Sequence, residues 1–189
     1  QADGTASRNT VNFGGPVTLG RAGSYSADYF PGNIDQVRIF NKELSSSEVT
    51  TLYNETVSTV NTLQVLGDTS CVATYQLDGN STDLSGNYNS TDTNIKYAYN
   101  GTESNIEYRF GRYGQAAVFN GSNSTIDTGY SLPAGSSDFS VSCWMNKTGT
   151  DIDGIWSTFT NSGTNRLGIG LQLQANGQVT AIGFDASGS

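Results

Sequence analysis

Short apolar stretches, separated by turn-forming residues, run along most of this chain. Alternation of apolar and polar positions is typical of strands that bury one face. In the stretch 139–145 the alternation places four residues on one face: Phe139, Val141, Cys143 and Met145. The same pattern predicts strands at 17–20, 32–40, 71–77, 116–119, 125–127, 155–159, 166–173 and 178–184.

The stretch 32–40 is partly apolar on both faces. If it alternates strictly, Ile34 and Arg38 lie on one face, and Val37 and Ile39 lie on the other. A strand with two partly apolar faces suits the interior of a two-layer sandwich. The chain therefore predicts an all-β sandwich, and Asn176-Gly177 predicts a hairpin between its last two strands.

One short helix is predicted near residues 46–54. Ser45 and Glu48 have the spacing of a capping box, in which each side chain accepts from the other residue's amide. Leu44 and Val49 stand at the positions of a hydrophobic staple. The apolar stripe of the helix would consist of Val49, Leu52 and Tyr53. We expect this helix to pack on the sandwich and to carry no chemistry.

Composition narrows the function classes. Hydrophobic residues make up 35% of the 189 residues and charged residues only 14%, so long amphipathic helices lack the residues that favour them. The net charge is −8, and the nine Lys and Arg residues form no cluster, which argues against nucleic acid or an anionic membrane as partner. No apolar run approaches the ~20 residues that span a bilayer. The chain has no His, which excludes His-dependent triads and His metal ligands.

Two cysteines, Cys71 and Cys143, leave two interpretations open. Free cysteines are commonly small buried hydrophobes, and the alternation around Cys143 favours that interpretation. A Cys71–Cys143 disulfide is the alternative. Two cysteines are too few to indicate the redox compartment.

Five segments carry a family resemblance: YFPGNIDQVRIFNKELS at 29–45, VATYQLDGN at 72–80, DLSGN at 83–87, FGRYGQAAVFNGS at 110–122 and FSVSCWM at 139–145. The first, with the helix after it, resembles the closing segment of laminin-G-like domains of the concanavalin A-like superfamily. The others resemble the opening and the next parts of the same domain, in order. The resemblance implies a concanavalin A-like jelly-roll β-sandwich with one short helix.

The order of these segments predicts the domain organisation. Residues 1–55 would be the C-terminal portion of one laminin-G-like domain, residues 56–69 a linker, and residues 70–189 the incomplete N-terminal portion of a second copy. A circularly permuted single domain is the alternative, but strands expected after residue 184, including the family's Trp-His strand, are missing. Since the chain begins with Gln1, we expect it to be processed or to belong to a longer polypeptide.

Catalysis is not expected. Superfamily members that hydrolyse glycans carry two closely spaced carboxylates on one strand, because retaining chemistry needs two carboxyl groups about 5 Å apart. The candidates here, Glu107 and the pair Asp151 and Asp153, do not form such a pattern. We therefore predict a non-enzymatic protein.

The sequence offers one candidate site for a bound metal ion, Ca²⁺. Asp78, Asn80 and Asp83 place oxygen ligands at spaced positions in one loop, as Ca²⁺ sites do, and laminin-G-like relatives imply the same ion. The loop lacks the terminal Glu of an EF-hand. The alternative is a loop of Asx turns, in which Asp and Asn accept from their own backbone. No other cofactor is predicted.

Two tyrosine pairs are candidates for glycan binding: Tyr25 with Tyr29, and Tyr97 with Tyr99. Sugar rings stack on such faces, and the hydroxyl adds a polar contact, although exposed tyrosines are ordinary in a chain with 10 of them.

Seven Asn-x-Ser/Thr sequons begin at Asn54, Asn80, Asn89, Asn100, Asn120, Asn123 and Asn146. These become glycosylation sites only in a secreted eukaryotic protein.

Two hypotheses about function remain. The first is a carbohydrate-binding or adhesion module on a virion or cell surface, whose partner is a surface glycan or glycoprotein. The expected tandem organisation and the Asn/Gly/Ser/Thr-rich composition of the chain resemble those of marine phage surface proteins such as tail fibres. The second is a structural subunit of a fibre, filament or capsid decoration. Both place the chain outside the cell or on a virion, as a homo-oligomer or as part of a longer tandem-repeat chain.

Overall fold

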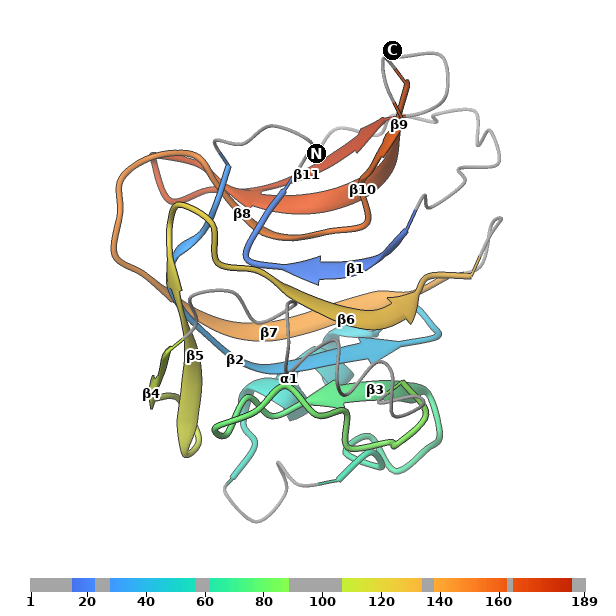
Figure 1. Ribbon diagram of the computed structural model, residues 1–189. Helices are drawn as coiled ribbons and strands as arrows, with labels where there is room; N and C mark the ends of the chain where they lie inside the picture. The colour runs from blue at the N-terminus through green and yellow to red at the C-terminus, as the bar shows by residue number, and fades with distance from the viewer. Residues whose placement is uncertain are drawn as a thin grey trace.

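Two antiparallel β-sheets face each other in the computed structural model (Figure 1), which describes residues 15–22, 28–56, 62–88, 107–133, 138–162 and 165–184. The six-stranded sheet contains β1 (Pro16–Leu19), β6 (Ile126–Ser131), β8 (Asp153–Ser157), β9 (Thr160–Ser162), β10 (Asn165–Leu173) and β11 (Val179–Phe184). The five-stranded sheet contains β2 (Pro31–Phe40), β3 (Cys71–Tyr75), β4 (Glu107–Phe110), β5 (Gln115–Asn120) and β7 (Ser140–Lys147). The prediction of an all-β sandwich is confirmed.

The first two strands lie in the interior of the sheets. β1 lies between β6 and β8, and β2 pairs with β7 along one side and with β3 and β5 along the other. The two segments that the sequence assigned to successive domain copies are therefore interleaved in one sandwich. That they descend from two tandem copies stays a prediction. Part of the expected linker is also packed, since Leu63, Val65 and Leu66 contact the cluster of Phe40, Leu52 and Cys71.

The main core fills the space between the sheets. It contains Phe30, Ile34 and Ile39 from the first segment and Tyr75, Phe119 and Trp156 from the second, among others. Phe30 and Phe119 meet edge to face at 6.4 Å, a favoured geometry for aromatic pairs. The Tyr75 hydroxyl donates to the Thr128 carbonyl oxygen at 2.7 Å and so links the two sheets.

A β-bulge in β2 changes which of its residues share a face. Its pairing with β7 shifts register between Asp35 and Arg38, and Gln36 between them has φ 49°. One extra residue moves the alternation by one position, so Ile34 joins Val37 in the core. Arg38 lies on the opposite face, where it pairs with Glu55. The expectation that Ile34 and Arg38 share a face is therefore wrong.

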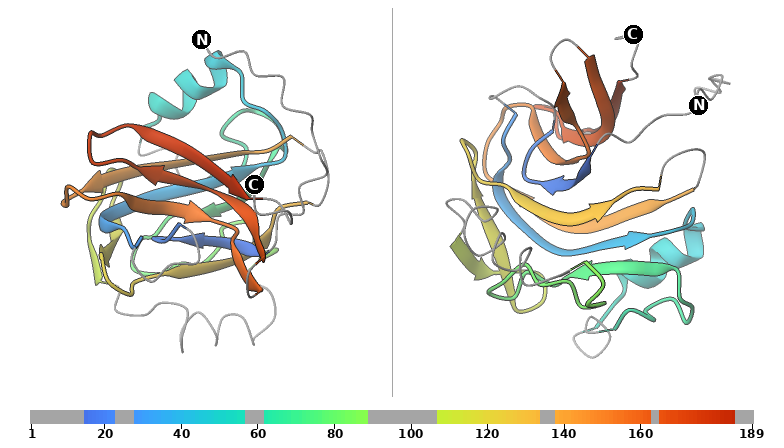
Figure 2. Two further views of the ribbon diagram at one scale, coloured as in Figure 1. Left: turned by 90° about the horizontal axis from the view of Figure 1, so that it is seen from above. Right: turned by 45° about the vertical axis from the view of Figure 1, so that its right-hand side comes forward.

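The helix α1 (Ser46–Tyr53) lies on the outer side of the five-stranded sheet (Figure 2). Its capping box is confirmed, with Ser45 N–H donating to Glu48 at 2.8 Å and Glu48 N–H donating to Ser45 Oγ at 3.4 Å. Of the expected apolar stripe only Leu52 is buried, whereas Val49 and Tyr53 are more than half exposed. In the described part of the chain, no helix is long and apolar enough to cross a membrane.

Cys71 and Cys143 are both free thiols. Cys71 packs with Phe40 under the helix, and Cys143 packs against the core between the sheets. They lie on opposite faces of the five-stranded sheet, so this structure matches the buried-hydrophobe interpretation.

The hairpin predicted at Asn176-Gly177 joins β10 and β11, with Leu173 opposite Val179.

Candidate functional site

A cleft of about 380 Å³ opens on the outer face of the five-stranded sheet, between β2, β7 and the turn from β4 to β5. Its volume lies within the ≈ 300–1,000 Å³ typical of ligand pockets. The residues that line it are Asn33, Asp35, Gly111, Arg112, Ala116, Trp144, Met145 and Asn146. They combine a buried acid, a cation, two side-chain amides and an aromatic ring.

Strand register brings the cleft residues together. Asp35 lies opposite Trp144, and Asn33 lies opposite Asn146, across the β2–β7 pair. Directly opposite residues share a sheet face, so all four project outward. The bulge at Gln36 follows Asp35 immediately, and bulges commonly re-aim side chains beside functional sites.

The turn from β4 to β5 forms the wall next to Asp35. It is closed by the Gly111 N–H, which donates to the Gly114 carbonyl oxygen at 3.0 Å. A Cβ at Gly111 would lie 2.5 Å from Asp35 Oδ2, so only glycine allows this approach. Gly114 has φ 73°, a left-handed conformation that glycine adopts without strain. This backbone holds Arg112 and Tyr113 over the sheet.

Arg112 lies over two aromatic rings. Its Cζ is 4.9 Å from the Trp144 ring centroid and 5.3 Å from that of Tyr113, within the range of cation–π attraction. Tyr113 is fixed by its hydroxyl, which donates to the Glu55 carbonyl oxygen at 2.8 Å. Tyr53, at the end of α1, packs at 5.5 Å from Trp144 and extends the aromatic surface outward. Among the described residues, the Arg112 guanidinium has neither an ion pair nor a hydrogen bond.

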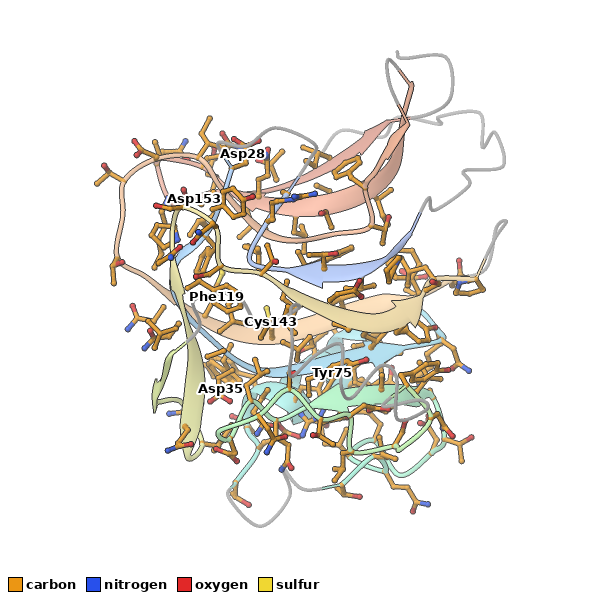
Figure 3. The ribbon with its side chains drawn as sticks, in the orientation of Figure 1. Asp28, Asp35, Tyr75, Phe119, Cys143 and Asp153 are labelled. Carbon is orange, nitrogen blue, oxygen red and sulfur yellow. The ribbon has the colours of Figure 1, made fainter. Side chains whose placement is uncertain are left out.

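Asp35 is the acid of the cleft, beside β5 in Figure 3. It is only 3% exposed. Its Oδ2 accepts from the Tyr113 N–H at 3.0 Å, while its Oδ1 has no hydrogen-bond partner in the described part of the chain. Burial raises the pKa of Asp35 to about 6, and the amides of Tyr113 and Arg112 offset part of that rise. An acid with such a pKa changes its charge near neutral pH.

This arrangement can bind a polar, ring-shaped ligand. Trp144, which is half-buried, and the exposed Tyr53 ring beside it offer apolar surface, while Asn33 and Asn146 offer both donors and acceptors. Arg112 offers donors only, and Asp35 offers an unsatisfied acceptor. Hydroxyl-rich molecules need this mixture of apolar faces and convergent polar groups.

The tyrosines predicted for glycan binding do not gather here. Tyr25, Tyr97 and Tyr99 lie outside the described residues. Tyr29 is half-buried before β2, where its backbone bridges Arg21 and Gly154, and it does not line the cleft. Their role in glycan binding stays a prediction.

The predicted calcium loop is held by its own hydrogen bonds. Asp78 Oδ1 accepts from the Gln115 N–H at 2.5 Å, and Asn80 Oδ1 accepts from the Thr82 N–H at 3.0 Å. Asp83 is buried and accepts from the Thr74 N–H at 2.8 Å. The Asn80 contact, and that of Asp83 Oδ1 with the Ser85 N–H at 3.1 Å, match the Asx turns of the alternative, whereas Asp78 accepts from a distant strand. No group of three acidic or Cys side chains suited to a metal occurs in the described residues, and the calcium site stays a prediction.

Sequence reasoning missed Asp35, Arg112 and Trp144 as site residues. Two signals for them existed. The alternation in 139–145 implies that Trp144 faces away from the core, and an Arg-Tyr pair flanked by Gly111 and Gly114 implies a tight turn. What was missing was the register that brings the two together.

Comparison with known families gives one match. The family model Laminin_G_3, described as the concanavalin A-like lectin/glucanases superfamily, matches residues 1–50. No curated protein and no solved structure matches the chain.

The match supports the domain family predicted from 29–45 and fits the two-sheet sandwich of a concanavalin A-like protein. It supports a module of the carbohydrate-binding type. The superfamily's description covers lectins as well as glucanases, so the prediction of a non-enzyme stays a prediction.

Proposed function

We propose that this chain is a non-catalytic glycan-binding module that mediates adhesion at a virion or cell surface, and that the cleft around Trp144 is its binding site. One observation carries the proposal. In one cleft meet Trp144, a guanidinium stacked on it that has no ion pair or hydrogen bond, and a carboxylate oxygen that has no hydrogen bond, as far as the described residues show. The family match to a lectin-containing superfamily supports the ligand class.

The cleft is preorganised for binding. Its side chains stand on two paired strands and on a turn closed by hydrogen bonds, so little conformational entropy is lost when a ligand binds. Arg112 and Tyr113 pack on Trp144, which fixes the aromatic ring before any ligand arrives. A weak, multivalent glycan contact would then gain strength from repeated copies of the module.

A glycan array followed by titration calorimetry tests this proposal. Trp144→Ala should weaken binding of any array hit at least tenfold, because aromatic side chains dominate the energetics of such contacts. Ile152→Ala is the matched control, since Ile152 is an exposed apolar residue that does not line the cleft. If Tyr25→Ala or Tyr97→Ala abolishes binding while Trp144→Ala does not, the site lies elsewhere on the chain.

A structural subunit is the second candidate function, and the sheet edges favour it. Among the described strands, β7 pairs only with β2 and β11 pairs only with β10. Between these edges runs an apolar groove of about 440 Å³, lined in part by Val141, Met145 and Val179. Open edges with apolar rows favour strand addition, here from a second copy of the chain.

Light scattering over a concentration series tests this second function. A structural subunit should form dimers or longer assemblies at micromolar concentration, and Val179→Lys at the edge should return it to a monomer. A monomer at all concentrations would exclude assembly through this edge.

The calcium proposal is tested separately, since Ca²⁺ at Asp78, Asn80 and Asp83 should raise the melting temperature of the wild type and not that of Asp78→Ala.

A further inference from the structure

We infer that the cleft selects an acidic sugar, a hexuronate whose carboxylate is bound by Arg112, and that Asp35 makes this binding dependent on pH. The inference rests on the glycan-binding function proposed above. It deepens that function by naming the chemical class of the ligand and the residue that sets its pH dependence.

The state of Arg112 indicates an anionic ligand. The chain has 17 acidic and nine basic residues, and among the described residues Lys42, Lys147 and Arg38 each have an acid within ion-pair distance. Arg112 instead stacks on Trp144 and Tyr113, with no acid in ion-pair distance among the described residues. These ring contacts hold the guanidinium beside the cleft and occupy none of its N–H donors, which can bind a carboxylate in bidentate geometry.

Asp35 supplies the second half of the recognition. Its Oδ1 is buried, lacks a hydrogen-bond partner and belongs to a residue that lines the same cleft. As a carboxylate, Asp35 repels an anionic ligand, whereas as a neutral acid it can donate a hydrogen bond. An anionic ligand therefore binds best when Asp35 is protonated.

The groups around Asp35 give the direction of the pH effect. Burial raises its pKa to about 6, and the charge of Asp78, from the loop after β3, acts in the same direction. From the β4–β5 turn Arg112 faces the cleft, and the β7 residues that line it, Trp144, Met145 and Asn146, are all uncharged. Binding of a hexuronate should therefore tighten as the pH falls through about 6.

Titration calorimetry with oligouronates tests the inference. The probes are trimers of galacturonate, glucuronate, mannuronate and guluronate, each compared with its uncharged methyl ester, together with a sulfated galactose oligomer. At pH 5 at least one trimer should bind tenfold or more tightly than its own ester, and it should weaken at least tenfold at pH 7.5. Arg112→Gln should remove the preference for the acid, and Asp35→Asn should remove the pH dependence. Lys42→Gln is the control, since Lys42 pairs with Glu48 and Asp68 and does not line the cleft.

The outcomes separate this inference from the proposed function. If neutral glycans bind and Trp144→Ala abolishes that binding, but no acid binds more tightly than its ester, the inference is wrong and the binding function stands. A preference for the sulfated oligomer over every uronate also overturns it. If no glycan binds the wild type at either pH, both proposals fail. Melting curves of each variant, measured alongside, show whether a loss of binding reflects a loss of fold.

Discussion

At the scale of single residues, Asp35 shows how a distant part of the chain creates a chemical environment. Its neighbours in sequence are apolar or amide residues, and nothing local marks it as unusual. Its partner Tyr113 lies 78 positions away, and its contact with Gly111 depends on the β4–β5 turn. A raised pKa of this kind cannot be predicted from the strand alone, because burial depends on which elements cover the residue.

Asp35→Asn should stabilise the protein at neutral pH. Because the pKa of Asp35 is raised from 3.8 to about 6, the folded state favours its protonated form. That stabilising contribution is full below pH 3.8 and is lost as the pH rises through about 6. Asn resembles the neutral acid, so it should add roughly 1–3 kcal/mol of stability at pH 7.5 and little at pH 4. Urea denaturation of both proteins at the two pH values checks this, and an equal change at both would contradict it.

Gly111→Ala should destabilise the fold by roughly 1–3 kcal/mol, as overpacking does. The new Cβ would lie 2.4 Å from the Gln115 carbonyl oxygen and 2.5 Å from Asp35 Oδ2, and would distort the β4–β5 turn and push it off the sheet. Gly183→Ala in β11 is the control, since its Cβ would meet Ile169 at 3.5 Å and the Gly168 carbonyl oxygen at 3.9 Å, both ordinary contacts. Thermal melts of the two variants compare them directly. Equal stability of both would mean that the turn does not approach Asp35 as described.

At the scale of elements, local rules explain what could be predicted from the sequence and what could not. The capping box at Ser45 and Glu48 depends on residues three apart, and it was predicted correctly. The hairpin at Asn176-Gly177 is equally local. The bulge at Gln36 has no such signal, because an extra residue is detected only against a partner strand. The bulge places Ile34 on the core face of the sheet, and Asp35 and Arg38 on its outer face.

The ion pair of Arg38 and Glu55 attaches the end of α1 to the sheet. Its atoms are 2.6 Å apart, and both side chains are only 2% exposed. Glu55→Ala should cost about 3–5 kcal/mol, because it leaves a buried charge without its partner. The double variant Arg38→Met with Glu55→Leu should recover much of that loss. Urea denaturation measures each change, and a single variant as stable as the wild type would show that the pair is not buried.

At the scale of the whole molecule, the first 40 residues complete both sheets. They contribute Val17, Leu19, Phe30, Ile34, Val37 and Ile39 to the shared core. Sequence reasoning detected both segments and their family resemblance, yet it could not show that they fold together. Pairing between strands far apart in sequence depends on the whole set of available partners.

A fragment of residues 70–189 should therefore not fold alone. Burial of one large apolar side chain contributes about 1.5–3 kcal/mol, so the loss of six is as large as the 5–15 kcal/mol by which domains are usually stable. Circular dichroism should show no cooperative melt for this fragment. Mixing it with a fragment of residues 1–56 should restore one. Cooperative unfolding of the 70–189 fragment on its own would mean that the segments are independent.

Glycan binding in the cleft also makes a prediction for the molecule as a whole, which has only two tryptophans. Trp144 lines the cleft, whereas Trp156 is buried in the core. A nitrogen–proton NMR titration with the best-binding glycan follows both indole signals in one spectrum. The Trp144 indole and the amides of Asn33 and Arg112 should shift together while the Trp156 indole stays in place. If those signals do not move while a glycan binds, the ligand does not occupy this cleft.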